Sequence, residues 1–447
     1  MEGYIQVIAN IILISFVIVF LLFAYTFIKE NEKRAAFISV IIASLLSLLI
    51  LFFTFAFSSS EIPYIVIISI TLIVSLVFII PLKNKIKTKP GVVRTPFDER
   101  DIMFSRMELK EGTTKFEEYY KNNPDKKILD DKFRLKPGLL SKDSTEYHKY
   151  KFASTDANFD TVNSFIPIID EIKTKEQQKI EPKELTNYIN KWLKQIGAIN
   201  VGITELKAHH LYSIKGRGKH YGEPITNKHK FAIAFIVEMD KDMIDTAPKA
   251  ETIMESSQQY LEAAKIAAQL THFIRNLGYS AKPHFDGNYD LICPVVAKDA
   301  GLGEFGRMGL LMTPELGPRV RIAVVTTNIP LNTNKYKYEP SIADFCTICK
   351  KCADNCPSNA ISFDKMKDEA GVMRWIINHE ACFTYWNITG TDCGKCIQVC
   401  PFSHPSNTMH NFIRKGIKNS YLFGQVALQM DDLFYGRKPN IKINRTL

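Results

Sequence analysis

The sequence predicts an α+β protein with a helical membrane anchor at its N-terminus and a cysteine-rich module near its C-terminus. Three observations lead to this fold class. The first ninety residues hold three long apolar runs, helix and strand patterns alternate between about 182 and 327, and eight of the nine cysteines fall into two runs between 346 and 400. Alternating elements followed by a separate cysteine module favour an α+β core with an added domain.

The apolar runs at 4–28, 35–57 and 64–82 are each about long enough to cross a bilayer as a helix of roughly 20 residues. No lysine or arginine precedes the first run, and no small-residue cleavage site follows it, so a secretory signal peptide is not expected. Residues 1–83 are therefore predicted to form an anchor of three membrane spans.

The basic residues around these runs predict an orientation. Lysine and arginine occur in the joints at 29–34 and 83–89, whereas the joint at 58–63 has none. Because basic joints stay in the cytoplasm, the N-terminus is expected outside and all residues after 83 inside the cell membrane. The formal charge of +10 is spread along the chain without a stripe of basic and aromatic residues, so membrane lipid is an expected partner and nucleic acid is not.

The remaining segments predict an ordered domain. Residues 84–180 are polar and rich in turn formers, and we expect an extended leader that wraps over a core at 181–335. The core should contain helices at 182–197 and 251–277 and strands at 198–204, 231–239 and 320–327. A cysteine-rich domain follows at 336–410, and the C-terminal segment 411–447 is expected to pack on the core.

The first cysteine run reads C-x2-C-x2-C-x3-C-P, which is the spacing of bacterial ferredoxins with two [4Fe–4S] clusters. In such proteins the last cysteine of each run reaches the other cluster. One cluster is then assigned to Cys346, Cys349, Cys352 and Cys400, and the other to Cys356, Cys382, Cys393 and Cys396. Two zinc sites or four disulfides are the alternatives, but the C-x3-C-P endings and the tight C-x2-C pairs disfavour them. The chain is therefore expected to transfer single electrons.

A glycine-rich stretch lies between 299 and 331, and its glycines allow the backbone to approach a bulky ligand closely. It contains the letters G-x-G-x-x-G of a dinucleotide loop. This match precedes a predicted strand instead of following one, so a Rossmann site is not expected.

Four motifs in this order resemble the corrinoid-dependent reductive dehalogenases over roughly 90–435. They are AGLGEFGRMGLLMTPELGPRVR, TTNIPL, ADNCPSNAI, and CFTYW followed by GTDCGKCIQVCPFSHP. The resemblance implies a nitroreductase-like corrinoid-binding core joined to a ferredoxin-like module. The sister family, epoxyqueuosine reductase, shares these cofactors but is soluble and usually carries a GWIGK-like string where this chain has GEFGR.

The resemblance also implies an activity. Electrons from the two clusters would reduce a cobalamin-type corrinoid to cobalt(I), which would remove halogen from a small organohalide. The electron donor would be a membrane partner, either quinone-linked or a ferredoxin or flavodoxin. An epoxyqueuosine-type reductase acting on tRNA and a membrane-tethered electron carrier without catalysis remain as alternatives.

Site residues follow from the matching motif positions. Tyr260 is expected to donate the proton, Arg321 to supply the cation beside it and Asn288 to position the tyrosine, with Arg319 and Arg307 as competing cations and Asp286 as an alternate acid. The residues expected to bind the corrinoid are Gly301, Gly303, Gly306, Gly309, Thr313 and Gly317. Cys293 lies in the strand-like LICPVV run and is interpreted as a small buried hydrophobe. His209, His210 and His284 are interpreted as ordinary polar or substrate-side residues.

Overall fold

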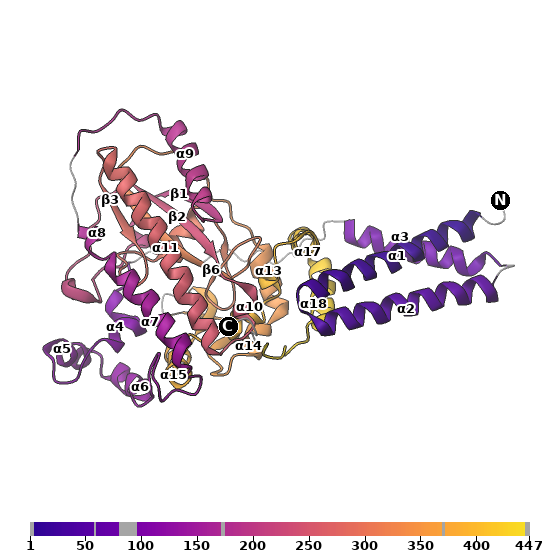
Figure 1. Ribbon diagram of the computed structural model, residues 1–447, viewed down its shortest axis with the longest axis horizontal. Coiled ribbons are helices and arrows are strands. Elements are labelled where there is room, and N and C mark those ends of the chain that lie inside the picture. The colour runs from indigo at the N-terminus through magenta and orange to yellow at the C-terminus, as the bar shows by residue number, and fades with distance from the viewer. Residues whose placement is uncertain (1–3, 58–59, 80–95, 171–174, 369–371, 443–447) are drawn as a thin grey trace. The chain divides into compact units, whose positions relative to one another are not determined.

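The computed structural model describes residues 4–57, 60–79, 96–170, 175–368 and 372–442. Their contacts divide the chain into two compact units (Figure 1). Unit 1 combines Met1–Lys87 with Ser406–Pro439, and unit 2 combines Thr88–Pro405 with Asn440–Leu447.

Unit 1 contains the apolar N-terminal helices α1 (Tyr4–Lys29), α2 (Lys33–Ala56) and α3 (Ile62–Ile79). Within the described residues, α1 and α2 are long and apolar enough to cross a membrane, whereas the apolar stretch counted in α3 is the shorter Ile62–Ile73. The prediction of three spans is corrected to two on this criterion. The joint residues 58–59 and the lysine-rich segment 83–89 lie outside the described residues.

The C-terminal helices α17 (Thr408–Asn419) and α18 (Tyr421–Phe434) pack on the N-terminal helices of unit 1. The rings of Phe27 and Phe434 lie 5.4 Å apart, and Arg34 Nε donates to the Leu433 carbonyl at 3.2 Å. The expectation that 411–447 packs on the core is therefore wrong for these helices, because the apolar side of α18 finds its partners on α1 and α2. Beyond them, Lys442 pairs with Asp245 of unit 2 at 2.7 Å.

The segment predicted as an extended leader is largely helical. Its helices begin at recognisable residues: the Thr113 side chain accepts from Phe116 N at the start of one, and Pro124 opens another. They are η1 (Glu99–Asp101), α4 (Met103–Met107), α5 (Thr114–Asn122), α6 (Pro124–Arg134), α7 (Lys149–Ser164) and α8 (Pro167–Asp170). These helices are short, α5 and α6 spanning 9 and 11 residues, and the longer α7 lacks an apolar face, so the sequence suggested a leader without them.

Unit 2 is built on an antiparallel sheet of order β1-β2-β6-β3. Its strands are β1 (Asn200–Glu205), β2 (Phe231–Glu238), β3 (Ala281–His284) and β6 (Val320–Thr327). Side chains of β2 alternate between two buried clusters, with Ile233 and Phe235 in one and Ala232 and Ala234 in the other. Both faces of the sheet are therefore covered, as the continuous apolar strands predicted.

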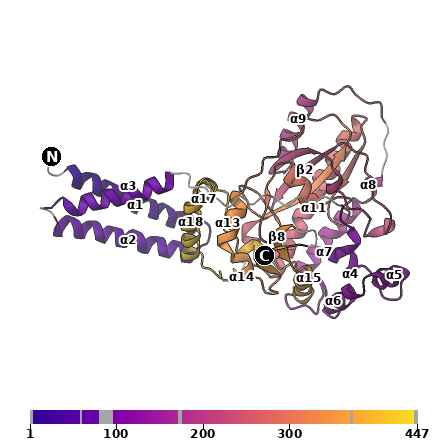
Figure 2. The same cartoon turned by 180° about the vertical axis from the view of Figure 1, so that it is seen from behind.

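The first face carries α9 (Pro182–Gln195) and the long α11 (Ala250–Asn276), and α7 lies along α11 (Figure 2). Lys151 of α7 pairs with Glu251 at 2.5 Å, and Asn158 donates to Ser257 Oγ at 3.0 Å. The predicted helices at 182–197 and 251–277 are thus found nearly where expected. The short elements η2 (Ala208–His210), η3 (Gly218–His220) and α10 (Lys241–Ile244) connect the strands.

The other face is covered by α12 (Cys293–Asp299), whose Val296 and Ala297 pack against β2 and β6. Cys293 is buried, as predicted, but begins a helix and not a strand because Pro294 favours the first helical turn. The glycine-rich stretch that follows forms the two-stranded pair β4 (Glu304–Phe305) and β5 (Leu311–Met312). No helix opens after G-x-G-x-x-G in this described stretch, in agreement with the rejection of a Rossmann loop.

The cysteine module completes unit 2. It alternates short helices with one β-hairpin, and its cysteines lie in or beside helix ends. Its elements are α13 (Ser341–Cys349), α14 (Lys351–Asp354), β7 (Ile361–Lys367), β8 (Met373–Ile377), α15 (His379–Thr389), α16 (Lys395–Gln398) and η4 (Pro401–Ser403).

Candidate functional site

Three cysteines of the first run and one of the second line one pocket of the cysteine module. They are Cys346, Cys349, Cys352 and Cys400, the set assigned to one cluster from the crossing pattern of the two runs. Arg307, Lys351, Phe345 and Phe402 line the same pocket. Apart from the charged heads the walls are apolar, which is the water-poor setting that suits an iron–sulfur cluster.

The other four thiols lie close enough to perturb one another. Cys356 raises the pKa of Cys382, of Cys393 and of Cys396, and Cys382 raises the pKa of Cys393 and of Cys396, in each case after burial. Burial is the main reason why the pKa of Cys382 is raised to about 11 and that of Cys393 to about 12. The neighbouring thiols raise both pKa values further. Cys382, eleven residues before Cys393, thus lies near Cys356 and Cys393, and its role as a cluster ligand stays a prediction.

The alternatives to clusters fit the thiols poorly. All nine cysteines are free, so the described chain contains no disulfide. In a tetrahedral zinc site, Zn–S bonds of about 2.3 Å place sulfurs about 3.8 Å apart. Within the described ranges, no three cysteine sulfurs lie within 4.8 Å of one another. The wider spacing leaves room for a polynuclear group, to which eight deprotonated thiols would supply the ligands.

Tyr260 and Arg321 meet above the sheet. Tyr260 projects from α11, and the guanidinium carbon of Arg321 in β6 lies 4.8 Å from the centre of its ring. Burial raises the pKa of Tyr260 to about 12, while the charge of Arg321 acts in the opposite direction. Burial disfavours the charged form of Arg321 and lowers its pKa. The nearby Tyr260, Asp392 and Asp286 have a larger combined effect, so the pKa of the guanidinium is raised. The predicted donor and cation are thus in contact.

Arg321 is held by two residues that the sequence did not single out. Its Nη2 donates to Ser256 Oγ at 2.7 Å and to Asp392 Oδ2 at 3.0 Å. Ser256 donates a short hydrogen bond to the same carboxylate oxygen. Ser256 lies one helical turn before Tyr260, and Asp392 directly precedes Cys393. The i, i+4 spacing in α11 was a signal for Ser256, but nothing in the sequence indicated that Asp392 reaches β6.

Asp286 lies on the same side of the site. Burial raises its pKa, and Arg217, Arg321 and a hydrogen bond from Tyr289 partly oppose that effect. Asp286 in turn raises the pKa of Tyr260 and of Tyr289, after burial. These groups and Arg321 are all partly exposed, so they border accessible space and are not sealed in the core. Asp286 therefore remains a second acid within reach of the same charges.

The side chain of Asn288 contacts Lys215. Its Oδ1 accepts from Lys215 Nζ at 3.0 Å, and Lys215 also pairs with Asp290 at 3.1 Å. In the part of the chain that the structure describes, no hydrogen bond joins Asn288 to Tyr260. The residue next to Asn288, Tyr289, does interact with Tyr260: after burial and Asp286, Tyr260 raises the pKa of Tyr289. The positioning role of Asn288 stays a prediction.

The residues of the glycine-rich stretch are packed against their own chain at several points. A Cβ atom would lie 2.3 Å from Met312 O at Gly303, 2.8 Å from the Met312 side chain at Gly306 and 2.6 Å from Phe402 at Gly317. Thr313 closes a turn by donating to Gly317 O at 3.1 Å. These glycines are needed for internal close approach, and a contact of this stretch with a corrinoid stays a prediction. Gly301 and Gly309 are exposed.

Arg319 is not a second cation for Tyr260. It is buried, pairs with Glu238 at 2.8 Å and donates to Ser403 O at 3.0 Å, so it joins the sheet to the end of the second cysteine run. Arg307 lines the cysteine pocket instead. Of the three arginines considered, Arg321 alone contacts Tyr260 among the described contacts.

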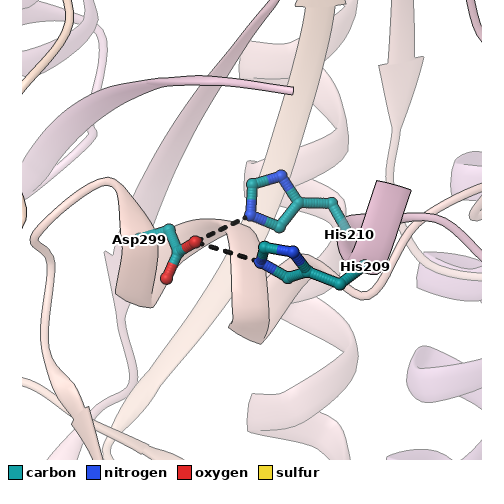
Figure 3. A group of neighbouring side chains, drawn as sticks. All are labelled: His209, His210 and Asp299. Carbon is teal, nitrogen blue, oxygen red and sulfur yellow. Dashed lines mark hydrogen bonds and ion pairs between the residues drawn. The ribbon is translucent and has the colours of Figure 1, made fainter. Parts of the chain in front are cut away.

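His209, His210 and Asp299 form a compact group in which both imidazoles point at one carboxylate oxygen (Figure 3). The two Nε2 atoms lie 3.2 and 3.1 Å from Asp299 Oδ2. However, the backbone N–H of Lys207 donates to His210 Nδ1 at 3.1 Å, so the proton of the neutral ring sits on Nε2. A protonated Nε2 donates to Asp299 and has no lone pair for a metal ion. The group is therefore a hydrogen-bonded link between η2 and α12.

Comparisons with known proteins agree with these features. The family model described as "4Fe-4S dicluster domain" matches residues 345–404. A tetrachloroethene reductive dehalogenase of Sulfurospirillum multivorans is 31% identical over 297 residues, covering 58% of this chain and 59% of that protein. A second one, from Desulfitobacterium hafniense, is 35% identical over 198 residues, covering 42% of this chain and 35% of the relative.

A solved structure of the catabolic reductive dehalogenase NpRdhA, a K488Q variant, superposes with a TM-score of 0.61 at 22% identity and covers 78% of this chain and 47% of that one. This likeness shows a shared fold. The chain spans less than two thirds of the length of these relatives. Epoxyqueuosine reductases match over a shorter part of the chain. The chain is thus a relative of the reductive dehalogenases and, more weakly, of the epoxyqueuosine reductases.

Proposed function

We propose that this protein is a membrane-anchored reductive dehalogenase that removes halogen from a small organohalide. The observation that carries the proposal is the contact of Arg321 with Tyr260, made in a site that Asp392 connects directly to the cysteine module. A proton donor with a fixed cation beside it is what replacement of a halogen by hydrogen requires of the protein.

The residues present fit the cofactors that this activity needs. Eight thiols in two groups can ligate two [4Fe–4S] clusters. A corrinoid would be placed beside Tyr260, where Arg321 Nε and Asp392 Oδ1 are buried without a hydrogen-bond partner and could meet polar groups of a ligand. When bound, the corrinoid would supply low-valent cobalt chemistry toward the carbon–halogen bond. The protein would supply placement, charge and the exclusion of water.

The chain's own groups then have separate tasks. Tyr260 holds a proton at its hydroxyl, because its raised pKa keeps the phenol protonated at neutral pH. Arg321 stabilises the negative charge that develops on Tyr260 Oη as the proton leaves. Ser256 and Asp392 hold the guanidinium in place through hydrogen bonds of 2.7 and 3.0 Å. Asp286, whose pKa is also raised by burial, is the alternate donor.

We also propose that α1 and α2 anchor the protein in the cell membrane with their connection on the cytoplasmic side, because Lys29, Lys33 and Arg34 cluster there. The packing of α18 against Phe27 and Arg34 places residues 406–439 at this end of the anchor. Residue 405 continues directly into the cysteine module, which supports a cytoplasmic unit 2. The electron donor would then be a cytoplasmic ferredoxin or flavodoxin or a quinone-linked membrane protein.

The test is cofactor analysis followed by turnover. Protein expressed anaerobically with cobalamin available should contain about eight irons and one corrinoid per chain. It should release chloride from tetrachloroethene or trichloroethene, the compounds named for its relatives, when reduced by a low-potential viologen. Full iron without corrinoid or halide release would favour a tethered electron carrier. Reduction of epoxyqueuosine in tRNA, without halide release, would favour the alternative enzyme.

A further inference from the structure

Arg307 is a buried cation without a carboxylate partner. Its residue is 1% exposed, and its guanidinium donates to the carbonyl oxygens of Ser362, Phe363, Cys346 and Thr347. Within the described residues, none of its hydrogen bonds reaches a carboxylate, and its Nε has no partner. Carbonyl dipoles satisfy the N–H groups, but they leave a full positive charge in a water-poor region.

Comparison with other buried arginines makes the difference clear. Arg106 pairs with Asp130 at 2.9 Å and with Glu380 at 2.8 Å, and Arg319 pairs with Glu238 at 2.8 Å. A buried cation that lacks such a partner costs several kcal/mol, so an anion is expected beside it. Within the described residues no carboxylate contacts Arg307, and Asp364 acts on its charge less than the thiols of Cys352, Cys346 and Cys349 do.

The position of Arg307 indicates what that counter-ion is. Arg307 lines the pocket formed by Cys346, Cys349, Cys352 and Cys400. A Cβ on the preceding Gly306 would lie 3.6 Å from Cys346 Sγ, so the backbone here runs beside the thiols. A [4Fe–4S] cluster with four thiolate ligands carries net negative charge, which becomes more negative by one unit on reduction.

The guanidinium is also fixed in place. It stacks on Trp375, with its central carbon 4.8 Å from the ring centre, and its fork bridges β7 to the helix that carries Cys346. A fixed charge in a low-dielectric site acts more strongly than a mobile surface charge. The second set of thiols has different neighbours: Lys395 lies near Cys393, and Asp392, beside Cys393, is paired with Arg321 at 3.0 Å.

We propose that Arg307 is the counter-ion of the cluster held by Cys346, Cys349, Cys352 and Cys400, and that it raises the reduction potential of this cluster above that of its partner cluster. The added electron is stabilised by the buried guanidinium, so this cluster is reduced first. The inference rests on the iron–sulfur part of the proposed function and not on the substrate or on the corrinoid.

The experiment is a redox titration followed by EPR on the full chain in detergent, anaerobic and loaded with iron. The wild type should show two reduction steps. Arg307→Gln should move one step to lower potential and leave the other unchanged, whereas Arg307→Lys, which keeps the charge, should stay near the wild type. Cys349→Ser and Cys356→Ser, which each alter the EPR signal of one cluster, assign the steps to the two sites.

Two outcomes would overturn the inference. One is an Arg307→Gln protein with full iron content and unchanged potentials. The other is a shift confined to the cluster that Cys356→Ser alters. If Arg307→Gln does not retain iron, Trp375→Glu is tested instead. It leaves Arg307 in place and puts a carboxylate at the position whose ring contacts the guanidinium. The expected result is a smaller downward shift of the same step, and no shift would contradict the proposal. A wild type that binds no iron would instead refute the proposed cluster function.

Discussion

Replacement of Arg321 by glutamine tests the central contact of the proposed site. The guanidinium carbon lies 4.8 Å from the ring centre of Tyr260. With an effective dielectric constant of about 20, a unit charge at this distance stabilises a phenolate by about 3.5 kcal/mol. This energy corresponds to roughly 2.5 pKa units, or to a few hundredfold in rate if it is fully expressed in the transition state. Because burial already raises the pKa of Tyr260 to about 12, loss of the cation makes it a still weaker acid.

The assay is halide release by the reconstituted Arg321→Gln protein, with iron and corrinoid measured in the same sample. We expect a loss of ten- to several hundredfold in kcat with little change in cofactor content. A matched control is the double variant Arg321→Gln/Asp392→Asn, which removes the carboxylate left unpaired by the single change. It should regain thermal stability but not activity. Turnover within about twofold of the wild type at full cofactor content would refute the assigned role of Arg321.

Three further changes have defined outcomes. Tyr260→Phe should lower turnover by about 10²–10⁴-fold without loss of iron, and an unchanged rate would move the donor role to Asp286, tested by Asp286→Asn. Cys382→Ser should lose about half of the iron, whereas Cys293→Ser should lose none, as measured by iron analysis; equal iron in both would remove Cys382 from the ligands. Burial lowers the pKa of His284 to about 3 and that of His229 to about 4, so the unfolded chain binds these protons first as the pH falls. Stability should therefore be full above about pH 6.5 and fall below it by about 1.4 kcal/mol per pH unit for each histidine, and a flat dependence of thermal unfolding between pH 6.5 and 4.5 would contradict this.

Elements with strong periodicity could be predicted from the sequence, and those held by distant contacts could not. The helix α11 and the strand β6 have continuous apolar patterns and lie within a few residues of their predicted bounds. The helices before α9 are short, and α7, which has 16 residues, lacks an apolar face, so they did not stand out in the sequence. The packing of α18 on α1 depends on a contact between Phe27 and Phe434, about which neither local sequence gives information.

The residues of the candidate site also differ in whether the sequence could indicate them. The cysteines, Tyr260 and Arg321 occupy motif positions, so sequence spacing or resemblance could point to them. Asp392 could not be found, because its importance comes from reaching Arg321 across 71 positions of the chain. For Asn288, a motif position suggested Tyr260 as its partner, the structure shows a hydrogen bond from Lys215 to its side-chain oxygen, and its role toward Tyr260 stays a prediction.

The composition of unit 1 has a consequence for how the protein is made and held. Unit 1 needs residues from both ends of the chain, so unit 2 is in effect an insertion between two pieces of one helical assembly. During synthesis, α1 and α2 emerge more than three hundred residues before α17 and α18. The apolar surface around Phe27 therefore stays uncovered until Phe434 of α18 has been made. In the finished protein, the chain crosses between the two units three times, after Lys87, after Pro405 and after Pro439. A single cut at any one of these crossings would therefore leave unit 2 covalently joined to the helices of unit 1.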